Sequence, residues 1–185
     1  MRLIESLGPP YPALDQGGFD CLRGYFSESL KVKGDVAEVG VYEGGTALFL
    51  CDWMRGSGKE LYLFDNFLGF QPTAEDYPLG IPEGWYEGGE EKVRELFKDE
   101  EKVHIVTGDC VETIKGFEDK TFCFVHLDLD LYMPTKACLE FFPERMIEGG
   151  VIMVHDYREL VGVTKAVREI VGDLLPEESY AVIRM

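Results

Sequence analysis

Short apolar segments alternate with longer segments of helical periodicity along the chain. The apolar segments are rich in branched and aromatic residues and end at Gly, Pro or Asp, which is typical of buried strands. The predicted strands are a segment ending at Val39 and residues 61–64, 104–109, 121–128, 150–156 and 180–185. The predicted helices are residues 19–30, 46–55, 90–97, 134–142 and 160–171.

Alternation of strands and helices indicates βαβ units. Such units form a mostly parallel sheet with helices on both faces, so we predict an α/β fold. A length of 185 residues is typical of one domain, and no repeat or linker divides the chain. We therefore expect a single domain over residues 1–185 with a helical N-terminal segment over residues 1–31.

Residues 66–89 form the longest segment without periodicity. The segment is rich in Gly, Pro and aromatic residues, including Phe67, Phe70, Tyr77, Trp85 and Tyr86. Loops of this length inside a compact domain are usually functional or mobile. We predict that residues 66–89 form a lid over a ligand site.

Acidic residues or a glycine loop follow five of the predicted strands. In open α/β sheets ligands bind beyond the carboxyl ends of the strands, so these residues should meet at one edge. They are Glu38 to Gly40, Asp65, Asp109, Asp128, and His155 with Asp156.

The glycine loop reads EVGVYEGG over residues 38–45. Gly40 and Gly44 would let the backbone approach a ligand at the start of a helix, although a simple turn explains a glycine pair equally well. The spacing differs from the G-x-G-x-x-G of nicotinamide-binding folds, which disfavours an oxidoreductase. Asp65 could bind two ribose hydroxyls or cap a turn, and Asp109 could accept from an adenine amino group or belong to a Gly-Asp turn.

The segment HLDLD places three polar residues where a buried strand ends. If the strand continued, His126, Asp128 and Asp130 would share one face. Burial of two carboxylates without partners is costly, so a turn into solvent, a cation or a metal must compensate them. His126 and His104 lie within or at the start of strands, and we interpret both as structural.

Charge and cysteine content narrow the class of protein. The chain has 35 Asp and Glu against 18 Lys and Arg, a formal net charge of −17, which argues against nucleic acid or anionic membrane as a partner. Its 5 cysteines are odd in number and form no C-x-x-C pair, as expected for reduced thiols. The segment MRLIESLGPPYP lacks a signal-peptide core, and no apolar segment is long enough to span a membrane. We expect a cytoplasmic protein.

Several of these segments together resemble the macrocin O-methyltransferase family, which are S-adenosylmethionine (SAM) enzymes of the class I fold. The resemblance runs in order from about Val32 to Ile170. It rests on VKGDVAEVGVYEGGTALFL, LYLFDNFLGF, VTGDCVETI, HLDLDLYMPTKACLEFFPERMIEGGVIMVHDY and GVTKAVREI.

The resemblance implies a Rossmann-like sheet and a role for each strand end. Glu38, Gly40 and Gly44 would surround the methionine part of SAM, Asp65 would bind its ribose, and Asp109 would lie near its adenine. A divalent metal, magnesium or manganese, would be held by Asp128, His155 and Asp156. Asp130 would be the catalytic base, and the family leaves room for a homo-oligomer.

His155 stands where the family has a carboxylate. Magnesium prefers oxygen ligands, whereas imidazole suits manganese, iron or zinc. Three alternatives follow: a changed metal held by Asp128, His155 and Asp156, a metal-free enzyme with His155 as the general base, or a substitution without effect.

The resemblance implies methyl transfer from SAM to a hydroxyl of a small molecule, specifically a sugar of a glycosylated natural product. An alcohol has a pKa of about 16 and a carboxylate of about 4, so proton transfer between them is uphill by about 16 kcal/mol. A metal can lower the pKa of a bound hydroxyl toward about 7, which would remove most of this barrier. The alternative is a module that binds SAM and catalyses nothing.

Overall fold

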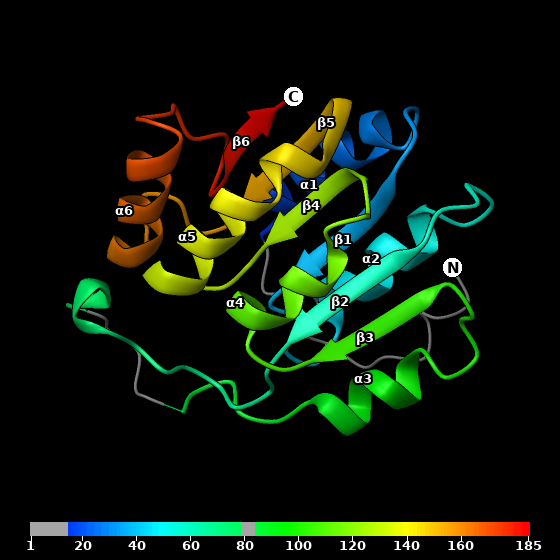
Figure 1. The fold of residues 1–185 in the computed structure, drawn as a ribbon, viewed down its shortest axis with the longest axis horizontal. Coiled ribbons are helices and arrows are strands. Elements are labelled where there is room, and N and C mark those ends of the chain that lie inside the picture. The colour runs from blue at the N-terminus through cyan, green and yellow to red at the C-terminus, as the bar shows by residue number, and fades with distance from the viewer. Residues whose placement is uncertain (1–14, 79–83) are drawn as a thin grey trace.

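A computed structural model describes residues 15–78 and 84–185. Within these ranges the chain forms a six-stranded sheet in the order β3-β2-β1-β4-β5-β6 (Figure 1). The strands are β1 (Asp35–Val39), β2 (Leu61–Asp65), β3 (Val103–Thr107), β4 (Phe122–Leu127), β5 (Met146–Val154) and β6 (Ala181–Arg184).

The sheet is mostly parallel, which confirms the prediction. Strands β1 to β5 pair in parallel, and only β6 runs antiparallel, against β5. In Figure 1 the arrowheads of β1 to β5 therefore reach one edge of the sheet while β6 points the other way. All five acid-bearing or glycine-bearing strand ends lie at that edge, as the sequence predicts.

Helices cover both faces of the sheet, as predicted. One face carries α1 (Gln16–Ser29), α2 (Gly45–Trp53) and α3 (Glu90–Leu96), whose apolar residues join one core cluster. The other face carries α4 (Cys110–Thr113), α5 (Tyr132–Phe141) and α6 (Val161–Ile170), which share the second cluster. The short helix α4 is not among the elements predicted from periodicity, because four residues are too few to show a period.

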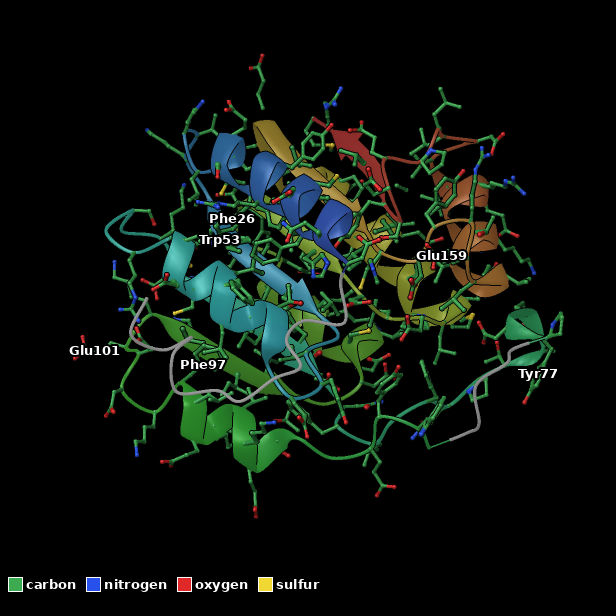
Figure 2. The ribbon with its side chains drawn as sticks, turned by 180° about the vertical axis from the view of Figure 1, so that it is seen from behind. Phe26, Trp53, Tyr77, Phe97, Glu101 and Glu159 are labelled. Atoms are coloured by element: carbon green, nitrogen blue, oxygen red, sulfur yellow. The ribbon has the colours of Figure 1, made fainter. Side chains whose placement is uncertain are left out.

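Helix α1 illustrates how a capping residue and regularly spaced apolar residues in the sequence produce a helix that packs on the sheet. Asp15 caps it by accepting a hydrogen bond from the backbone N–H of Gly18 at 2.8 Å. Leu22 and Phe26, four residues apart on one face, are buried against the sheet, and Phe26 meets the Phe124 ring at 5.0 Å. Figure 2 shows Phe26 beside Trp53 of α2, at a ring distance of 5.8 Å. The N-terminal helical segment thus occupies residues 16–29, and residues 1–14 lie outside the described ranges.

Strand β1 lies at the point where the strand order reverses. It pairs with β2 on one side and with β4 on the other, and the helices that follow β1 and β4 cover opposite faces. Ligands of open α/β sheets bind at such a point because the loops diverge there and leave a crevice. The loop after β1 and the residues after β4 are therefore the place to look for a site.

The segment 66–89 leaves the end of β2 and runs across this edge toward α6 before it returns to α3 (Figure 1). It contains a short 3-10 helix, η2 (Ala74–Asp76), and its residues 79–83 lie outside the described ranges. The two ends of the segment pair with each other through an antiparallel bridge between Leu68 and Glu87. The segment is therefore tied to the sheet at its base.

Candidate active site

The loop after β1 packs directly against the end of β4. Gly40 has φ +89, and a Cβ at this position would lie 1.9 Å from the carbonyl oxygen of Asp128. The backbone N–H of Asp128 also donates to the carbonyl of Val39 at 2.9 Å. Only glycine fits here, so one function of Gly40 is to bring the β1 loop against the β4 end. Gly44, with φ +85, precedes the first residue of α2.

Asp65 holds the same loop in place. Its Oδ2 accepts hydrogen bonds from the backbone N–H groups of Val41 at 2.6 Å and Tyr42 at 2.8 Å, and its Oδ1 accepts from Phe67 at 2.7 Å. A carboxylate can accept about four hydrogen bonds, so about one position is left for a ribose hydroxyl. Asp65 thus holds the glycine loop in place, a role that comes beside the ribose binding expected from the sequence.

Asp109 follows β3 at the start of α4. Its carboxylate accepts a hydrogen bond from the backbone N–H of Val111 at 3.0 Å and thereby caps the helix. Gly108, just before it, donates to the carbonyl of Asp65 at 3.0 Å, which joins the ends of β2 and β3. Asp109 is therefore at the edge that the sequence predicts, with its side chain also used in a cap.

Glu38 points into the protein, not toward the loop. The residue is 1% exposed, and its Oε1 lies 3.1 Å from Nδ1 of His126, which is fully buried on the neighbouring strand β4. Burial raises the pKa of the Glu38 carboxyl, and the hydrogen bond to His126 opposes this. Glu38 Oε2, His126 Nε2 and the hydroxyl of nearby Tyr180 are buried without a hydrogen-bond partner among the described residues.

Asp128, His155 and Asp156 come together at the ends of β4 and β5. Nδ1 of His155 lies 3.0 Å from Asp128 Oδ1 and 3.4 Å from Asp156 Oδ1. One ligand atom from each of the three residues lies within 4.8 Å of the others, and these are the only residues among the described ranges that form such a group. The structure therefore assembles the three residues that the sequence predicts as metal ligands.

The charged groups in this cluster shift one another's pKa values. Burial opposes ionisation of Asp128, but the charge of His155 and the hydrogen bond to it lower the pKa of Asp128 below its usual value. Burial likewise opposes protonation of His155, and the two neighbouring carboxylates outweigh it and raise the pKa of the imidazole. Burial and the carboxylates of Asp128 and Asp156 raise the pKa of Asp130 well above its usual range.

The expected row of His126, Asp128 and Asp130 on one strand face is wrong. Strand β4 ends at Leu127, and Asp130 has φ +60, so the extended alternation stops before it. His126 points into the core, whereas Asp128 and Asp130 lie in the loop that follows. The turn compensates the carboxylates, because it places them beside His155 and within partial reach of solvent.

Backbone strain is concentrated around this cluster. Seven non-glycine residues among the described ranges have positive φ, a conformation that costs on the order of 1–3 kcal/mol each. Five of them belong to the loops at the site: Tyr42, Phe67, Tyr86, Asp130 and Asp156. Such strain persists only where the surrounding structure enforces it, and it is common at functional sites.

Asp76 anchors segment 66–89, and sequence analysis missed it. Its side chain is 1% exposed, and its Oδ1 accepts from the backbone N–H of Tyr132 at 2.6 Å, the first residue of α5. Its Oδ2 accepts from the backbone N–H of Thr73 at 2.8 Å and from the Thr73 hydroxyl at 3.0 Å. The signal was present as T-x-x-D, the pattern of a capping box.

The sheet order and the site at the β1 and β4 ends define a class I methyltransferase fold. Two solved structures share it with a TM-score of 0.79 each. They are the calicheamicin methyltransferase CalS11, 21% identical, with 99% of this chain and 90% of that chain covered, and the O-methyltransferase NovP, 20% identical, with 95% and 82% covered. An O-methyltransferase from Bacillus cereus in complex with SAH (S-adenosylhomocysteine) has a TM-score of 0.60 at 13% identity, covering 98% of this chain and 84% of that chain.

The family follows from the sequence match. Residues 20–173 match the model of the macrocin-O-methyltransferase (TylF) family, and the chain belongs to this family. This confirms the resemblance found in the sequence.

Two curated relatives are O-methyltransferases of Streptomyces species. The chain is 28% identical over 167 residues to 8-demethyl-8-(2,3-dimethoxy-alpha-L-rhamnosyl)-tetracenomycin-C 4'-O-methyltransferase of Streptomyces olivaceus, with 76% of this chain and 64% of the relative covered. It is 26% identical over 140 residues to demethyldecarbamoylnovobiocin O-methyltransferase of Streptomyces niveus, with 68% and 53% covered. The chain thus spans between about half and two thirds of the length of these relatives.

Proposed function

We propose that this protein transfers a methyl group from SAM to a hydroxyl of a sugar on a glycosylated natural product. One observation carries the proposal: a member of the macrocin-O-methyltransferase family places a carboxylate and imidazole cluster beside the glycine loop at the carboxyl ends of β1 and β4. The name of the Streptomyces olivaceus relative, which contains a rhamnosyl group, supports a sugar hydroxyl as the acceptor.

The cofactor would lie along the ends of β1, β2 and β3. Gly40 and Gly44 would permit its close approach, the remaining acceptor position of Asp65 would take a ribose hydroxyl, and Asp109 would lie near the adenine. Glu38 would influence the cofactor through the glycine loop and not by direct contact, because its carboxyl points into the protein and is hydrogen-bonded to His126. SAM would supply an electrophilic methyl group on a sulfonium.

Asp130 would accept the proton of the acceptor hydroxyl. A C–O bond to the methyl group forms as the S–C bond breaks, and the hydroxyl proton passes to the Asp130 carboxylate. Because burial and the neighbouring carboxylates raise the pKa of Asp130, its ionised form is a stronger base than an ordinary carboxylate. His155 is the second candidate base in its neutral form, and its bonds to Asp128 and Asp156 fix the imidazole. Because the two carboxylates also raise its pKa, it must lose its own proton before it can accept one from the hydroxyl.

The donor set of Asp128, His155 and Asp156 fits a divalent metal. Two carboxylates and one imidazole suit manganese, iron or zinc better than magnesium. These three residues would hold the ion, which would lower the pKa of a coordinated hydroxyl. Without an ion, a protonated His155 lies between the two carboxylates and supplies one compensating charge.

The protein would work on a small molecule in the cytoplasm. None of the helices in residues 15–78 and 84–185 is long and apolar enough to span a membrane. All five cysteines are free thiols, four of them buried, which supports a reducing compartment. The family also leaves room for a homo-oligomer.

Calorimetric titration with SAM and SAH tests the cofactor, and transfer of label from methyl-tritiated SAM to p-nitrophenyl α-L-rhamnopyranoside tests the activity. We expect binding of both nucleosides and transfer to the rhamnoside. Binding without transfer to this or other glycosides would favour a SAM-binding module that catalyses nothing. No binding of either nucleoside would refute the proposal.

The same assay with EDTA, MnCl2 and MgCl2 tests the metal. We expect EDTA to abolish transfer and manganese to restore it better than magnesium. The variant His155→Asp should reverse this preference, because it completes an all-oxygen donor set. Glu144→Gln, which neutralises a carboxylate on a side chain that is 82% exposed, is the control for a change of charge away from the site. Transfer that is insensitive to EDTA would leave Asp130 or His155 as the base without a metal.

A further inference from the structure

The ring of Tyr86 joins segment 66–89 to the loop after β1. It meets the Tyr42 ring edge-on at 5.0 Å and the Phe70 ring edge-on at 5.3 Å, and Trp85 stacks on it at 5.9 Å. Tyr42 follows Val41 in the glycine loop, and Asp65 holds its backbone N–H. Tyr86 thus belongs in sequence to the segment predicted as a lid, and in space it packs against the glycine loop after β1.

The backbone around Tyr86 is fixed. Phe70 N–H donates to the carbonyl of Trp85 at 2.9 Å, Gly84 N–H donates to Phe70 at 2.8 Å, and Gly88 N–H donates to Phe67 at 2.9 Å. Gly89 packs so closely that a Cβ there would lie 2.4 Å from the carbonyl oxygen of Tyr42. The positive φ of Tyr86, +63, is therefore enforced by the surrounding backbone.

Tyr86 remains partly exposed to solvent near the cluster of Asp128, His155 and Asp156. It is 46% exposed, although Tyr42 and Phe70 contact its ring. The loop of Tyr42, which this ring contacts, packs against the β4 end, since a Cβ on Gly40 would lie 1.9 Å from the Asp128 carbonyl oxygen. A phenol is protonated at neutral pH and can donate a hydrogen bond. One side chain therefore offers an apolar ring and a polar tip beside the candidate base.

We propose that Tyr86 positions the acceptor: its ring packs against the apolar C–H face of the acceptor sugar, and its hydroxyl directs the reacting hydroxyl toward Asp130. This inference rests on the proposed function and names the residue that selects a sugar ring.

A sugar matches this arrangement in shape and polarity. Binding pockets combine aromatic walls with a few placed polar groups that fix orientation. A pyranose has a C–H face for the ring of Tyr86 and hydroxyls at its rim for the carboxylates below. Trp85, 56% exposed and stacked on Tyr86, would extend the wall toward the aglycone.

Three variants separate the ring from the hydroxyl and from the lid in general. Tyr86→Leu removes the ring, and Tyr86→Phe removes only the hydroxyl. Tyr77→Leu is the matched control, because Tyr77 is a 59% exposed aromatic residue of the same segment with no ring contact among the described residues. Figure 2 shows Tyr77 at the outer end of the segment, beside η2.

The full chain is used for each variant, with urea midpoints to check folding. Calorimetry measures the Kd of SAH, saturation-transfer NMR measures the Kd of p-nitrophenyl α-L-rhamnopyranoside, and label transfer gives kcat and KM. We expect Tyr86→Leu to weaken rhamnoside binding about tenfold, the usual loss for one well-packed aromatic contact, with SAH affinity unchanged. Tyr86→Phe should keep most of the rhamnoside affinity and lose kcat, and Tyr77→Leu should change neither.

Three results would overturn the inference. The first is unchanged rhamnoside affinity in Tyr86→Leu, and the second is an equal loss in Tyr77→Leu. The third is a wild-type protein that binds SAH but not the rhamnoside, since the wall would then not select a sugar. A wild-type protein that does not bind SAH would instead refute the proposed function and this inference with it.

Discussion

Glu38 and His126 lie side by side on neighbouring strands, with Glu38 Oε1 3.1 Å from His126 Nδ1 and both side chains buried. Glu38 lies two residues before Gly40 on β1, and His126 lies two residues before Asp128 on β4. It therefore connects the interior of the sheet to the two loops that form the site. Its remaining polar atoms, Glu38 Oε2 and His126 Nε2, make no hydrogen bond with the described residues.

We predict that His126→Leu lowers the free energy of unfolding by about 3 kcal/mol, because it leaves the buried Glu38 carboxyl without a partner. The double variant Glu38→Leu/His126→Leu should lose less free energy of unfolding than the sum of the two single variants, because neither partner is left buried and unpaired. Urea unfolding followed by circular dichroism measures these energies.

The pair of His104 and Glu60 is the control for this prediction. It joins β3 to the residue just before β2, at 2.6 Å, but its side chains are 42% and 32% exposed. His104→Leu should therefore cost less than about 1 kcal/mol. Equal losses at His104 and His126 would show that burial does not decide the effect.

We predict that Gly40→Ala destabilises the protein by about 3 kcal/mol or more and abolishes SAH binding. The new Cβ would lie 1.9 Å from the Asp128 carbonyl oxygen, so the β1 loop and the β4 end must separate. Gly56→Ala is the matched control, because Gly56 has φ +80 but nothing within 4 Å. It should cost only the conformational strain, about 1 kcal/mol, and leave SAH binding intact. Similar effects of the two variants in urea unfolding and calorimetry would contradict the prediction.

We predict that Asp76→Ala loosens segment 66–89 and costs about 2 kcal/mol, because three hydrogen bonds are lost, one of them to the first residue of α5. Gly162→Ala should act in the same way without changing Asp76, since its Cβ would lie 2.1 Å from Asp76 Oδ1. Hydrogen exchange followed by mass spectrometry should show faster exchange in this segment for both variants. Glu75→Ala, next to Asp76, should leave exchange unchanged; a loosening as large as that of Asp76→Ala would argue against a specific anchor.

We predict that Cys21 reacts slowly with iodoacetamide at pH 8. Burial and the carboxylates of Glu177 and Glu178 raise the pKa of its thiol to about 11, and an acid with a raised pKa keeps its proton to higher pH. Since the thiolate is the reactive form, alkylation should be roughly a hundredfold slower than for a free cysteine and rise about tenfold per pH unit toward pH 11. Peptide mapping after timed alkylation measures the rate.

The double variant Glu177→Gln/Glu178→Gln tests the cause. It should lower the pKa of Cys21 and speed alkylation at pH 8, because two of the three contributions come from these carboxylates. A rate that levels off near pH 9 in the wild type would contradict a raised pKa.

The sheet, the two helical layers and the edge that carries the site all follow from local patterns in the sequence. Apolar periodicity is a local property, and parallel strands must bring their carboxyl ends to one edge, so Asp65, Asp109, Asp128 and His155 could be placed without coordinates. The assignment of Asp128, His155 and Asp156 as metal ligands came from the family resemblance, and the structure brings the three together because β4 and β5 are neighbours.

Tertiary structure alone decided where the side chains point and what they contact. The direction of the Glu38 side chain depends on its pairing with His126, 88 residues away in the chain. The number of hydrogen bonds that the Asp65 carboxylate accepts depends on three backbone N–H groups from two loops. Strand β4 ends at Leu127, and the positive φ of Asp130 turns the chain away from the strand face that alternation implied. The roles of Asp76 and Tyr86 arise from the path of an aperiodic segment, for which a single sequence holds little information because long-range contacts set the conformation.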